Sequence, residues 1–261
     1  MNIAVCLKQV PDTADLRIDK ETNTLIREGV EAVLNPLDEF PLEAALRLRQ
    51  AGGGRVTVVT MGPPAAADVL RTGLAFGADE AVLLSDRAFA GADTWATSLT
   101  LAAAIRETGP FDLVLCGKQA VDGDTAQVGP EIAAHLDWAQ VTYATRLERE
   151  DDRHLLVDRL FDDGHARLRV RLPAVVTVLK EANEPRLPSL SARIRSLRCE
   201  IRTLGAHAVG IEPNRLGLEG SPTRVDRIAV PESGRQTTRF EGGPAETAQR
   251  LAEVLAPFRP S

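Results

Sequence analysis

One loop and the strand before it constrain the fold of this chain more than any other feature. The apolar run Phe111 to Cys116 (FDLVLC) is followed by Gly117 to Pro130 (GKQAVDGDTAQVGP), which leads into the helical pattern Glu131 to Leu136. A short apolar run between turn residues is typical of a buried strand, so we expect the loop at the carboxyl end of a parallel sheet. Because open α/β sheets bind nucleotides at that edge, the loop is a candidate nucleotide-binding site.

The helix after this loop has a predictable start. Pro130 has no amide hydrogen and fits only a first helical turn, so the helix is expected to begin near Gln127 or Val128. The amides around Ala126 to Gly129 would then lack partners inside the helix, and such amides attract a phosphate group. Thr125 and Gln127 are candidate side-chain donors to the same group.

The two aspartates of the loop have a different expected role. Asp122 and Asp124 would repel a phosphate, so we expect them to accept hydrogen bonds from loop amides or from ribose hydroxyls. Gly123 between them is expected to permit a turn that a side chain would hinder. The residues alone leave a second interpretation open, in which the segment is a plain connection between a strand and a helix.

Length and composition fit a globular α/β protein. The 261 residues are enough for one large domain, or a domain with an extension, without a disulfide or a metal. The chain is 44% hydrophobic and 26% charged, and no apolar run is long enough to span a bilayer. The N-terminus, MNIAVCLKQVPD, resembles a first strand and lacks a basic leader or a cleavage site. We therefore expect a cytoplasmic protein without direct membrane insertion.

Charge and reactive residues exclude several functions. A net charge of −6 argues against nucleic acid as the main partner, although a small anion can still bind through amides. Cys6, Cys116 and Cys199 are far apart, which disfavours a disulfide framework and favours buried, unreactive thiols. The four histidines show no metal-ligand spacing, and no nucleophile has a partnered base. We therefore predict neither a metal site nor catalytic residues.

The first half of the chain alternates between strand-like and helix-like segments. The strands are predicted at Ile3 to Lys8, Val56 to Thr60, Ala81 to Leu84 and Leu113 to Cys116. The helices are predicted at Leu37 to Gln50, Ala65 to Phe76, Thr94 to Arg106 and Pro130 to Leu136. Gly52 to Gly54 and Gly77 are expected to end the first two helices, and Asp93 to cap the third. This rhythm is typical of a parallel sheet.

The second half of the chain has a different pattern. Strands with alternating polarity are predicted at Tyr143 to Glu148, His154 to Asp158 and Ala166 to Arg171, followed by a buried strand at Ala174 to Leu179. They are expected to add antiparallel strands at an edge of the sheet. Beyond Glu181 prolines interrupt the chain, and its only long helical pattern is Ala245 to Leu255. Such a tail is typical of a linker or of an arm ordered by another protein. Within Arg17 to Arg27, two short extended pieces are predicted around a turn at Glu21 to Asn23.

Several motifs in a fixed order resemble one family over nearly the whole chain, the beta subunits of electron transfer flavoproteins. They are Val5 to Asp12 (VCLKQVPD), Asn35 to Glu39 (NPLDE), Thr60 to Pro63 (TMGP), Gly77 to Glu80 (GADE), Gly117 to Gly129 and Leu172 to Arg186 (LPAVVTVLKEANEPR). The resemblance implies a three-layer, mostly parallel Rossmann-like sheet, similar to the adenine nucleotide alpha hydrolases, with antiparallel edge strands and an extended C-terminal arm. It divides the chain into a nucleotide-binding α/β domain, residues 1–200, and an arm that embraces an alpha subunit, residues 201–261.

The same resemblance implies a function. With an alpha subunit the chain would form a heterodimer that carries flavin adenine dinucleotide (FAD). The heterodimer would pass electrons from acyl-CoA or other dehydrogenases to a quinone oxidoreductase or another acceptor. The chain would thus be an electron carrier subunit rather than a stand-alone enzyme. Its own nucleotide would be adenosine monophosphate (AMP) in a carrier of the ordinary kind, and a second FAD in a bifurcating member.

Motif positions imply which residues contact that nucleotide. They are Cys6, Asn35, Pro36, Leu37, Asp38, Met61, Gly117, Lys118, Gln119, Ala120, Val121, Asp122, Gly123, Asp124, Thr125, Ala126, Gln127 and Val128. For Cys6 and Met61, ordinary core packing explains the residue as well as ligand contact does. A further motif, Asn183 to Ile194, matches the family's partner-docking loop, with Leu190 at the position of the exposed anchor.

Three loop residues and two segments resemble the bifurcating and nitrogen-fixation branch. Gly123, Ala126 and Val128 replace polar residues of ordinary members, and Lys8 to Thr13 and Ser85 to Ser98 also resemble this branch. There the second FAD would accept a hydride from NADH, and the electrons would divide between a high-potential acceptor and ferredoxin or flavodoxin.

Two threonines and one rival function remain open. Thr94 and Thr97 would face the second FAD, or are cap and surface residues. The rival is an ATP-using hydrolase or adenylating enzyme, which needs cations around the transferred phosphate. Lys118 is the only cation in the candidate loop, and the chain has neither a GxxxxGK[ST] loop nor an SGG-type loop.

Overall fold

The structure is a computed structural model that describes residues 1–12, 17–18, 25–26, 32–226 and 237–258. The chain divides into two compact units, Met1–Asp226 and Arg227–Ser261. None of the helices in the described ranges combines the length and the apolar content needed to cross a membrane.

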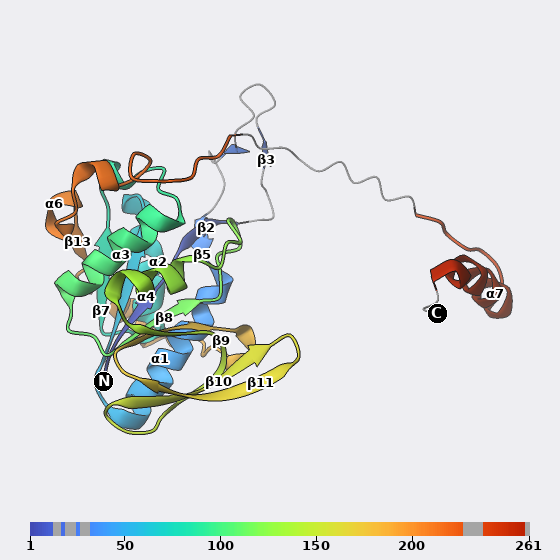
Figure 1. Ribbon diagram of the computed structural model, residues 1–261, viewed down its shortest axis with the longest axis horizontal. Helices are drawn as coiled ribbons and strands as arrows, with labels where there is room; N and C mark the ends of the chain where they lie inside the picture. Colours follow the sequence, from blue (N-terminus) through green and yellow to red (C-terminus); the bar gives the residue numbers. More distant parts are fainter. Residues whose placement is uncertain (13–16, 19–24, 27–31, 227–236, 259–261) are drawn as a thin grey trace. The chain divides into compact units, whose positions relative to one another are not determined.

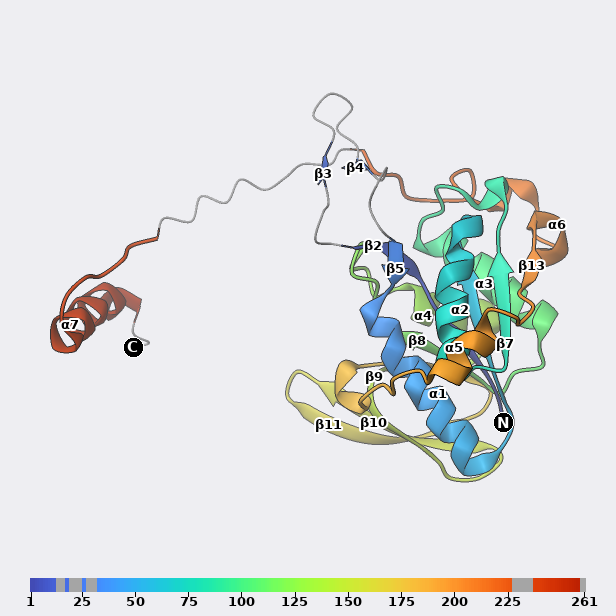
Figure 2. The same cartoon turned by 180° about the vertical axis from the view of Figure 1, so that it is seen from behind.

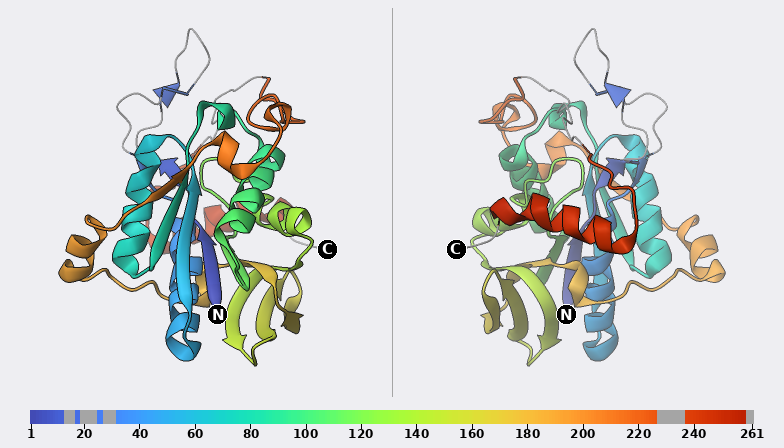
Figure 3. Two further views of the ribbon diagram at one scale, coloured as in Figure 1. Left: turned by 90° about the vertical axis from the view of Figure 1, so that its left-hand side faces the viewer. Right: turned by 90° about the vertical axis from the view of Figure 1, so that its right-hand side faces the viewer.

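A nine-stranded sheet forms the centre of the first unit (Figure 1), with the strand order β11-β10-β9-β12-β8-β1-β6-β7-β13. Its strands are β1 (Asn2–Cys6), β6 (Arg55–Met61), β7 (Glu80–Leu84), β8 (Leu113–Gly117), β9 (Ala139–Arg149), β10 (His154–Phe161), β11 (Gly164–Arg171), β12 (Ala174–Val178) and β13 (Arg202–Leu204). The seven strands β9, β12, β8, β1, β6, β7 and β13 are neighbours in this spatial order, and each adjacent pair among them is parallel. The pairs β9–β10 and β10–β11 are antiparallel and form a group at one edge (Figure 3). The predicted mostly parallel sheet with antiparallel edge strands is confirmed.

Two short ladders lie outside this sheet. β2 (Gln9–Pro11) pairs with β5 (Ala32–Leu34), and β3 (Arg17–Ile18) pairs with β4 (Leu25–Ile26), each antiparallel. The two extended pieces predicted between residues 17 and 27 are thus confirmed. The turn predicted between them, residues 21–23, lies outside the described residues.

Helices cover both faces of the sheet, in three layers. They are α1 (Glu39–Gly52), α2 (Ala67–Phe76), α3 (Thr94–Thr108), α4 (Val128–Leu136), α5 (Leu190–Ser196) and α6 (Ala206–Val209), with 3-10 turns at η2 (Pro36–Asp38), η3 (Pro64–Ala66), η4 (Arg87–Phe89), η5 (Lys180–Ala182) and η6 (Pro213–Arg215). α3 and α4 lie on the face seen in Figure 1, and α1, α2 and α5 lie on the face seen in Figure 2.

The two apolar cores explain why the central strands are apolar at most positions on both of their faces. Successive side chains of a strand point to opposite faces, and here both faces are covered. In β6, Val56 and Val58 pack with α1 and α2, whereas Val59 packs with α3 and α4. In β1, Val5 belongs to the first core and Ala4 to the second. Each buried strand therefore joins the two layers of helices.

Helix ends follow the expected signals. Asp93 caps α3 by accepting a hydrogen bond from the amide of Ala96 at 3.0 Å. Gly53 and Gly77 follow α1 and α2 with φ of 70° and 127°, a region that favours glycine. α4 begins at Val128, as Pro130 predicts.

The boundary between the units differs from the expected one at residue 200. β13 pairs with β7 and so belongs to the sheet of the first unit. Ser221 and Thr223 also join that unit, because Asp93 donates its amide to the Ser221 hydroxyl and accepts from the Thr223 amide, at 2.8 and 2.9 Å. The prolines that suggested a tail lie among the short elements β13, α6 and η6, which belong to the first unit. This unit therefore ends at Asp226.

The second unit contains α7 (Pro244–Leu255) and the turn η7 (Ala256–Phe258). The helix matches the predicted pattern. Its role as an arm remains a prediction.

Candidate functional site

The candidate site is the edge of the sheet at which β1, β6, β8 and β12 end. These strands are parallel neighbours, so their last residues, Cys6, Met61, Gly117 and Val178, lie along one edge. The loop 118–127 leaves β8 there and enters α4. We call this edge, with the loop and the first turn of α4, the rim.

The side chain of Asn35 holds the backbone of the loop 118–127 through hydrogen bonds. Its Nδ2 donates to the carbonyl of Gln119 at 3.0 Å and to Oδ1 of Asp38 at 2.9 Å. Its Oδ1 accepts from the amide of Val121 at 3.2 Å. The side chain is 1% exposed, and all of these bonds are internal. Asn35 therefore acts on the loop by holding its backbone.

Asp38 completes this support. Its carboxylate accepts from the amide of Lys8 at 2.7 Å, from Asn35 and from the amide of Gly117. Burial raises the pKa of Asp38 from 3.8 to about 7, against the opposing effect of these hydrogen bonds and of the Lys8 charge. A Cβ on Gly117 would lie 2.4 Å from Oδ1 of Asp38 and 2.7 Å from the carbonyl of Leu37, so the close approach requires glycine. We call Asn35, Asp38 and Gly117 the brace.

The aspartates of the loop accept hydrogen bonds from side chains, and no loop amide of the described residues donates to them; the other expected partner, a ribose hydroxyl, stays a prediction. Oδ1 of Asp122 lies 2.6 Å from Nζ of Lys8, and Asp124 accepts from the side-chain amide of Gln119. The expected role of Gly123 is wrong. Its φ is not in the left-handed region, and a Cβ there would meet nothing within 4 Å. The left-handed residues are Asp124 and Ala126, with φ of 52° and 55°.

The first turn of α4 presents free donors. The amides of Ala126, Gln127, Val128 and Gly129 have no hydrogen-bond partner among the described residues. Since both aspartates of the loop are paired, no free carboxylate of the loop competes for these amides. Aligned free amides at a helix N-terminus bind anions. This is the strongest structural support for a phosphate site.

α3 meets α4 beside these amides. The hydroxyl of Thr94 lies 3.1 Å from Oε1 of Glu131 and 3.3 Å from Oε1 of Gln127. The other carboxylate oxygen of Glu131 is buried without a partner in the described part of the chain. Gly129 allows α4 to lie close to β12, because a Cβ there would be 2.5 Å from Cγ2 of Thr177. Sequence reasoning had assigned no role to Glu131 or to this contact of Gly129.

The predicted contact residues differ in accessibility. Pro36, Val121, Asp122, Gly123, Asp124, Thr125 and Gln127 are exposed; Cys6, Leu37, Met61, Thr94, Thr97, Gly117, Lys118, Gln119, Ala120, Ala126 and Val128 are half-buried; and Asn35 and Asp38 are buried. Cys6, Met61 and Val128 border the core on the α3 side. The Cys6 thiol and burial together raise the pKa of the Cys116 thiol, which stays protonated. Ligand contact at all these positions stays a prediction.

Two further contacts of the rim were not predicted from the sequence. Lys8 forms an ion pair with Asp122. In the sequence, Lys8 stood out only as part of the motif Val5 to Asp12, which gave it no partner. Nζ of Lys118 lies 5.7 Å from the ring centroid of Tyr143, within reach of a cation–π interaction. Tyr143 has a φ of 60° at an irregularity of the β9–β12 pairing. No local sequence signal indicates these pairs.

Leu190 lies apart from the rim. It is the first residue of α5, which packs against α2, and its side chain is 75% exposed. The structure thus presents the predicted anchor on the surface of the first unit.

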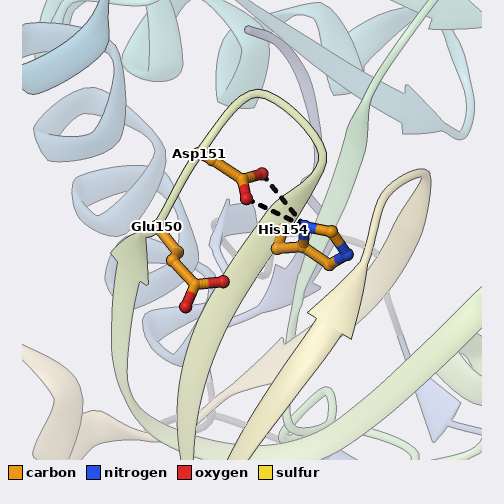
Figure 4. Close-up of side chains that lie close together, drawn as sticks. All are labelled: Glu150, Asp151 and His154. Atoms are coloured by element: carbon orange, nitrogen blue, oxygen red, sulfur yellow. Dashed lines mark hydrogen bonds and ion pairs between the residues drawn. The ribbon is translucent and has the colours of Figure 1, made fainter.

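A group of possible metal ligands lies at the turn between β9 and β10 (Figure 4). Glu150, Asp151 and His154 could each offer one ligand atom to a common ion. Arg169 already contacts all three, with Nη2 3.1 Å from Nδ1 of His154 and 3.5 Å from Oδ2 of Asp151. The guanidinium offsets part of the charge of the two exposed carboxylates and already occupies their oxygens, so the group gives no reason to assign a metal.

A cavity of about 780 Å³ lies away from the rim. It is lined by residues of α1, β9 and β10, among them Arg47, Thr145 and Arg149, and by Ala182 and Asn183 at the end of η5. None of the residues 117–128 lines it.

Comparisons with known proteins agree with the motifs. A family model described as the electron transfer flavoprotein domain matches residues 22–208. An electron transfer flavoprotein subunit beta from Thermoanaerobacterium thermosaccharolyticum is 49% identical over 98% of both chains. Protein FixA of Azorhizobium caulinodans is 48% identical over 98% of this chain and 94% of its own length. The caffeyl-CoA reductase-Etf complex subunit CarD of Acetobacterium woodii is 49% identical over 88% of both.

Proposed function

This chain belongs to the electron transfer flavoprotein family, and we propose that as the beta subunit it holds an adenine nucleotide at the rim. The family match and the near full-length relatives establish an electron transfer role in a heterodimer with an alpha subunit. FAD is the family's redox group, and it supplies an acceptor and donor of one or two electrons.

The free amides of α4 are the observation that carries the proposal. The amides of residues 126–129 form an anion site at the rim, and the brace holds the loop that leads to them. These residues fit the phosphate groups of an adenine nucleotide. Thr125 and Gln127 would add side-chain donors, while Cys6 and Met61, at the ends of β1 and β6, would contact the nucleotide. The other predicted contacts follow the loop and η2.

We propose a second FAD, rather than AMP, as that nucleotide. Ala126 and Val128 place small apolar side chains at the amides, where ordinary members carry polar ones. The similarity to Protein FixA and to CarD also favours the bifurcating branch. In that case NADH would be the hydride donor. A dehydrogenase such as an acyl-CoA dehydrogenase, and a quinone oxidoreductase, ferredoxin or flavodoxin, would be the partners.

Counting bound nucleotides tests this proposal. The chain is co-expressed with its alpha subunit, and the nucleotides released by acid are quantified by chromatography. Two FAD per heterodimer would support the second flavin, and one FAD with one AMP would support the alternative of a structural AMP. A colourless heterodimer that hydrolyses ATP would contradict both.

A substitution that adds one negative charge at the first turn of α4 tests whether the nucleotide binds there. Gln127→Glu keeps the shape of the side chain but sets a carboxylate at the free amides, where it repels a phosphate. The helix dipole favours this charge by about 0.3–1 kcal/mol, and the carboxylate of Glu131, which shares the Thr94 hydroxyl with residue 127, opposes it. We expect the occupancy of the beta-subunit nucleotide to fall at least about threefold while the melting temperature of the nucleotide-free protein changes little. Gln140→Glu adds the same charge at the exposed start of β9 and is the matched control. Equal occupancy in both variants would move the nucleotide elsewhere.

A further inference from the structure

A short segment of the first unit exposes several large apolar side chains. In residues 183–197, which we call the docking segment, Leu187, Leu190 and Leu197 are 91%, 75% and 69% exposed. Its first part, residues 183–189, contains no helix or strand. A segment of this kind binds a partner well only if its backbone is already held in place, because ordering it on binding costs free energy.

A buried carboxylate of α1 holds the start of this segment. Glu43 is 2% exposed, and its Oε2 accepts from Nε of Arg186 at 2.7 Å and from the amide of Arg186 at 3.3 Å. Its Oε1 accepts from Nη2 of Arg186 at 3.1 Å and from Nε of Arg47 at 2.6 Å. Both carboxylate oxygens thus bind the same guanidinium, a geometry that fixes direction as well as distance.

Other bonds of α1 act on the same stretch. Arg47 donates from Nη2 to the carbonyl of Glu184 at 3.0 Å, and Asn183 donates from Nδ2 to the carbonyl of Phe40 at 3.0 Å. Arg186 also reaches Oε1 of Gln50 at 3.2 Å. Burial raises the pKa of Glu43, but the hydrogen bonds of Arg186 and Arg47 outweigh it and leave the pKa below its ordinary value. Glu43 is therefore ionised at neutral pH.

We propose that Glu43 is a positioning residue for protein docking, which fixes Arg186 so that Leu187 and Leu190 are presented to a partner dehydrogenase in one orientation. The inference rests on the proposed function, since it assumes that electrons arrive from such a partner. An ion pair whose carboxylate is buried and whose guanidinium is half-buried adds little net stability compared with packed apolar side chains. Because both oxygens of Glu43 contact the guanidinium of Arg186, the pair instead fixes the direction in which the irregular part of the docking segment leaves α1.

Two variants and one control test the role of Glu43 in the complex with the alpha subunit. Glu43→Gln keeps the volume but removes the charge, and Arg186→Lys removes the bidentate contact while keeping a charge. Glu80→Gln removes a carboxylate from the exposed pair Arg55–Glu80, whose atoms lie 2.6 Å apart, and serves as the control. The probe is a purified acyl-CoA dehydrogenase with its acyl-CoA substrate. Its reduction of the complex is measured against the concentration of complex.

We expect both variants to raise the KM for the complex by about three- to tenfold, because one or two side chains must then be ordered on binding. The kcat, the flavin content and the flavin spectrum should stay unchanged. Hydrogen–deuterium exchange of residues 183–197 should accelerate in both variants and stay unchanged in Glu80→Gln. The double variant should be no worse than either single variant, because both remove one contact. A lower melting temperature with unchanged KM would assign Glu43 a structural role only and would overturn the inference.

The exchange measurement also separates the two proposals. If the wild-type complex accepts no electrons from the dehydrogenase, the proposed partner is wrong, yet the exchange of residues 183–197 still reports on positioning. Unchanged exchange in Glu43→Gln and Arg186→Lys would overturn the positioning role. Arg186→Lys keeps the test valid if Glu43→Gln does not fold.

Discussion

Asp38 shows how a single buried carboxyl group can connect the site to solution conditions. Among the described residues, the group accepts from donors that are fixed in place: the amides of Lys8 and Gly117 and the side chain of Asn35. The charged groups around it are Lys8, which is paired with Asp122, and Glu39, whose own pKa is raised by burial. The Cys6 and Cys116 thiols lie nearby, and Asp38 itself helps to raise the pKa of Cys116. Burial dominates and raises the pKa of Asp38 to about 7.

This shift predicts a pH dependence of stability. Between pH 3.8 and about 7 the folded protein keeps a proton that the unfolded chain releases, so the free energy of unfolding falls as pH rises through this window. The contribution is at most ~4 kcal/mol, at about 1.4 kcal/mol for each tenfold change in proton affinity. Asp38→Asn removes the titration. We expect urea unfolding between pH 5 and pH 8 to show a flatter profile for the variant than for the wild type. Parallel profiles would contradict a raised pKa at this position.

At the scale of the element, the position of α4 depends on one missing methyl group. The free amides of the rim point where they do because α4 lies close against β12 at Gly129. Alanine favours a helix over glycine by about 1 kcal/mol, so local propensity alone would favour a substitution here. Packing opposes it, because the added Cβ would be 2.5 Å from Cγ2 of Thr177.

We therefore expect Gly129→Ala to destabilise the protein by about 1–3 kcal/mol, despite its better helix propensity, and to lower nucleotide occupancy. Thr177→Ser removes the opposing methyl group and keeps the hydroxyl that accepts from the amide of Tyr143 at 3.1 Å. In the double variant most of the lost stability should return. Urea unfolding of all four proteins gives the coupling energy, and additive effects would show that the two groups do not meet.

At the scale of the whole molecule, the two compact units predict separable roles. The first unit contains the sheet, the rim and the docking segment. In the second, Leu251, Val254 and Leu255 lie on one face of α7 and are each about half exposed, and no residue of this helix is buried. An apolar helix face of this kind is expected to be covered by the alpha subunit.

A chain that ends at Asp226 tests this division. We expect its thermal unfolding to stay cooperative, with a midpoint close to that of the full chain, because the core residues all lie before this position. Its affinity for the alpha subunit, measured by calorimetry, should fall at least about tenfold, as the loss of one buried helix face implies. The combined substitution of Leu251 and Leu255 by serine in the full chain should weaken association in the same way. Full affinity in both proteins would exclude α7 from the interface.

The sequence by itself determined the parallel sheet, the strands of the main sheet except β13, the cap at Asp93 and the start of α4 at Val128. These depend on periodicity and on signals within a few residues. It did not place residues 201–226 in the first unit, assign the left-handed residues to Asp124 and Ala126, or find α5 and α6.

Only the tertiary structure decided which side chains meet. Asn35 holds Gln119, and Glu43 holds Arg186, across 84 and 143 positions of the chain. Local patterns carry no information about such partners. The order of the strands brings η2 and α1 beside loops that follow much later in the chain, and burial then allows only donors and acceptors that satisfy each other.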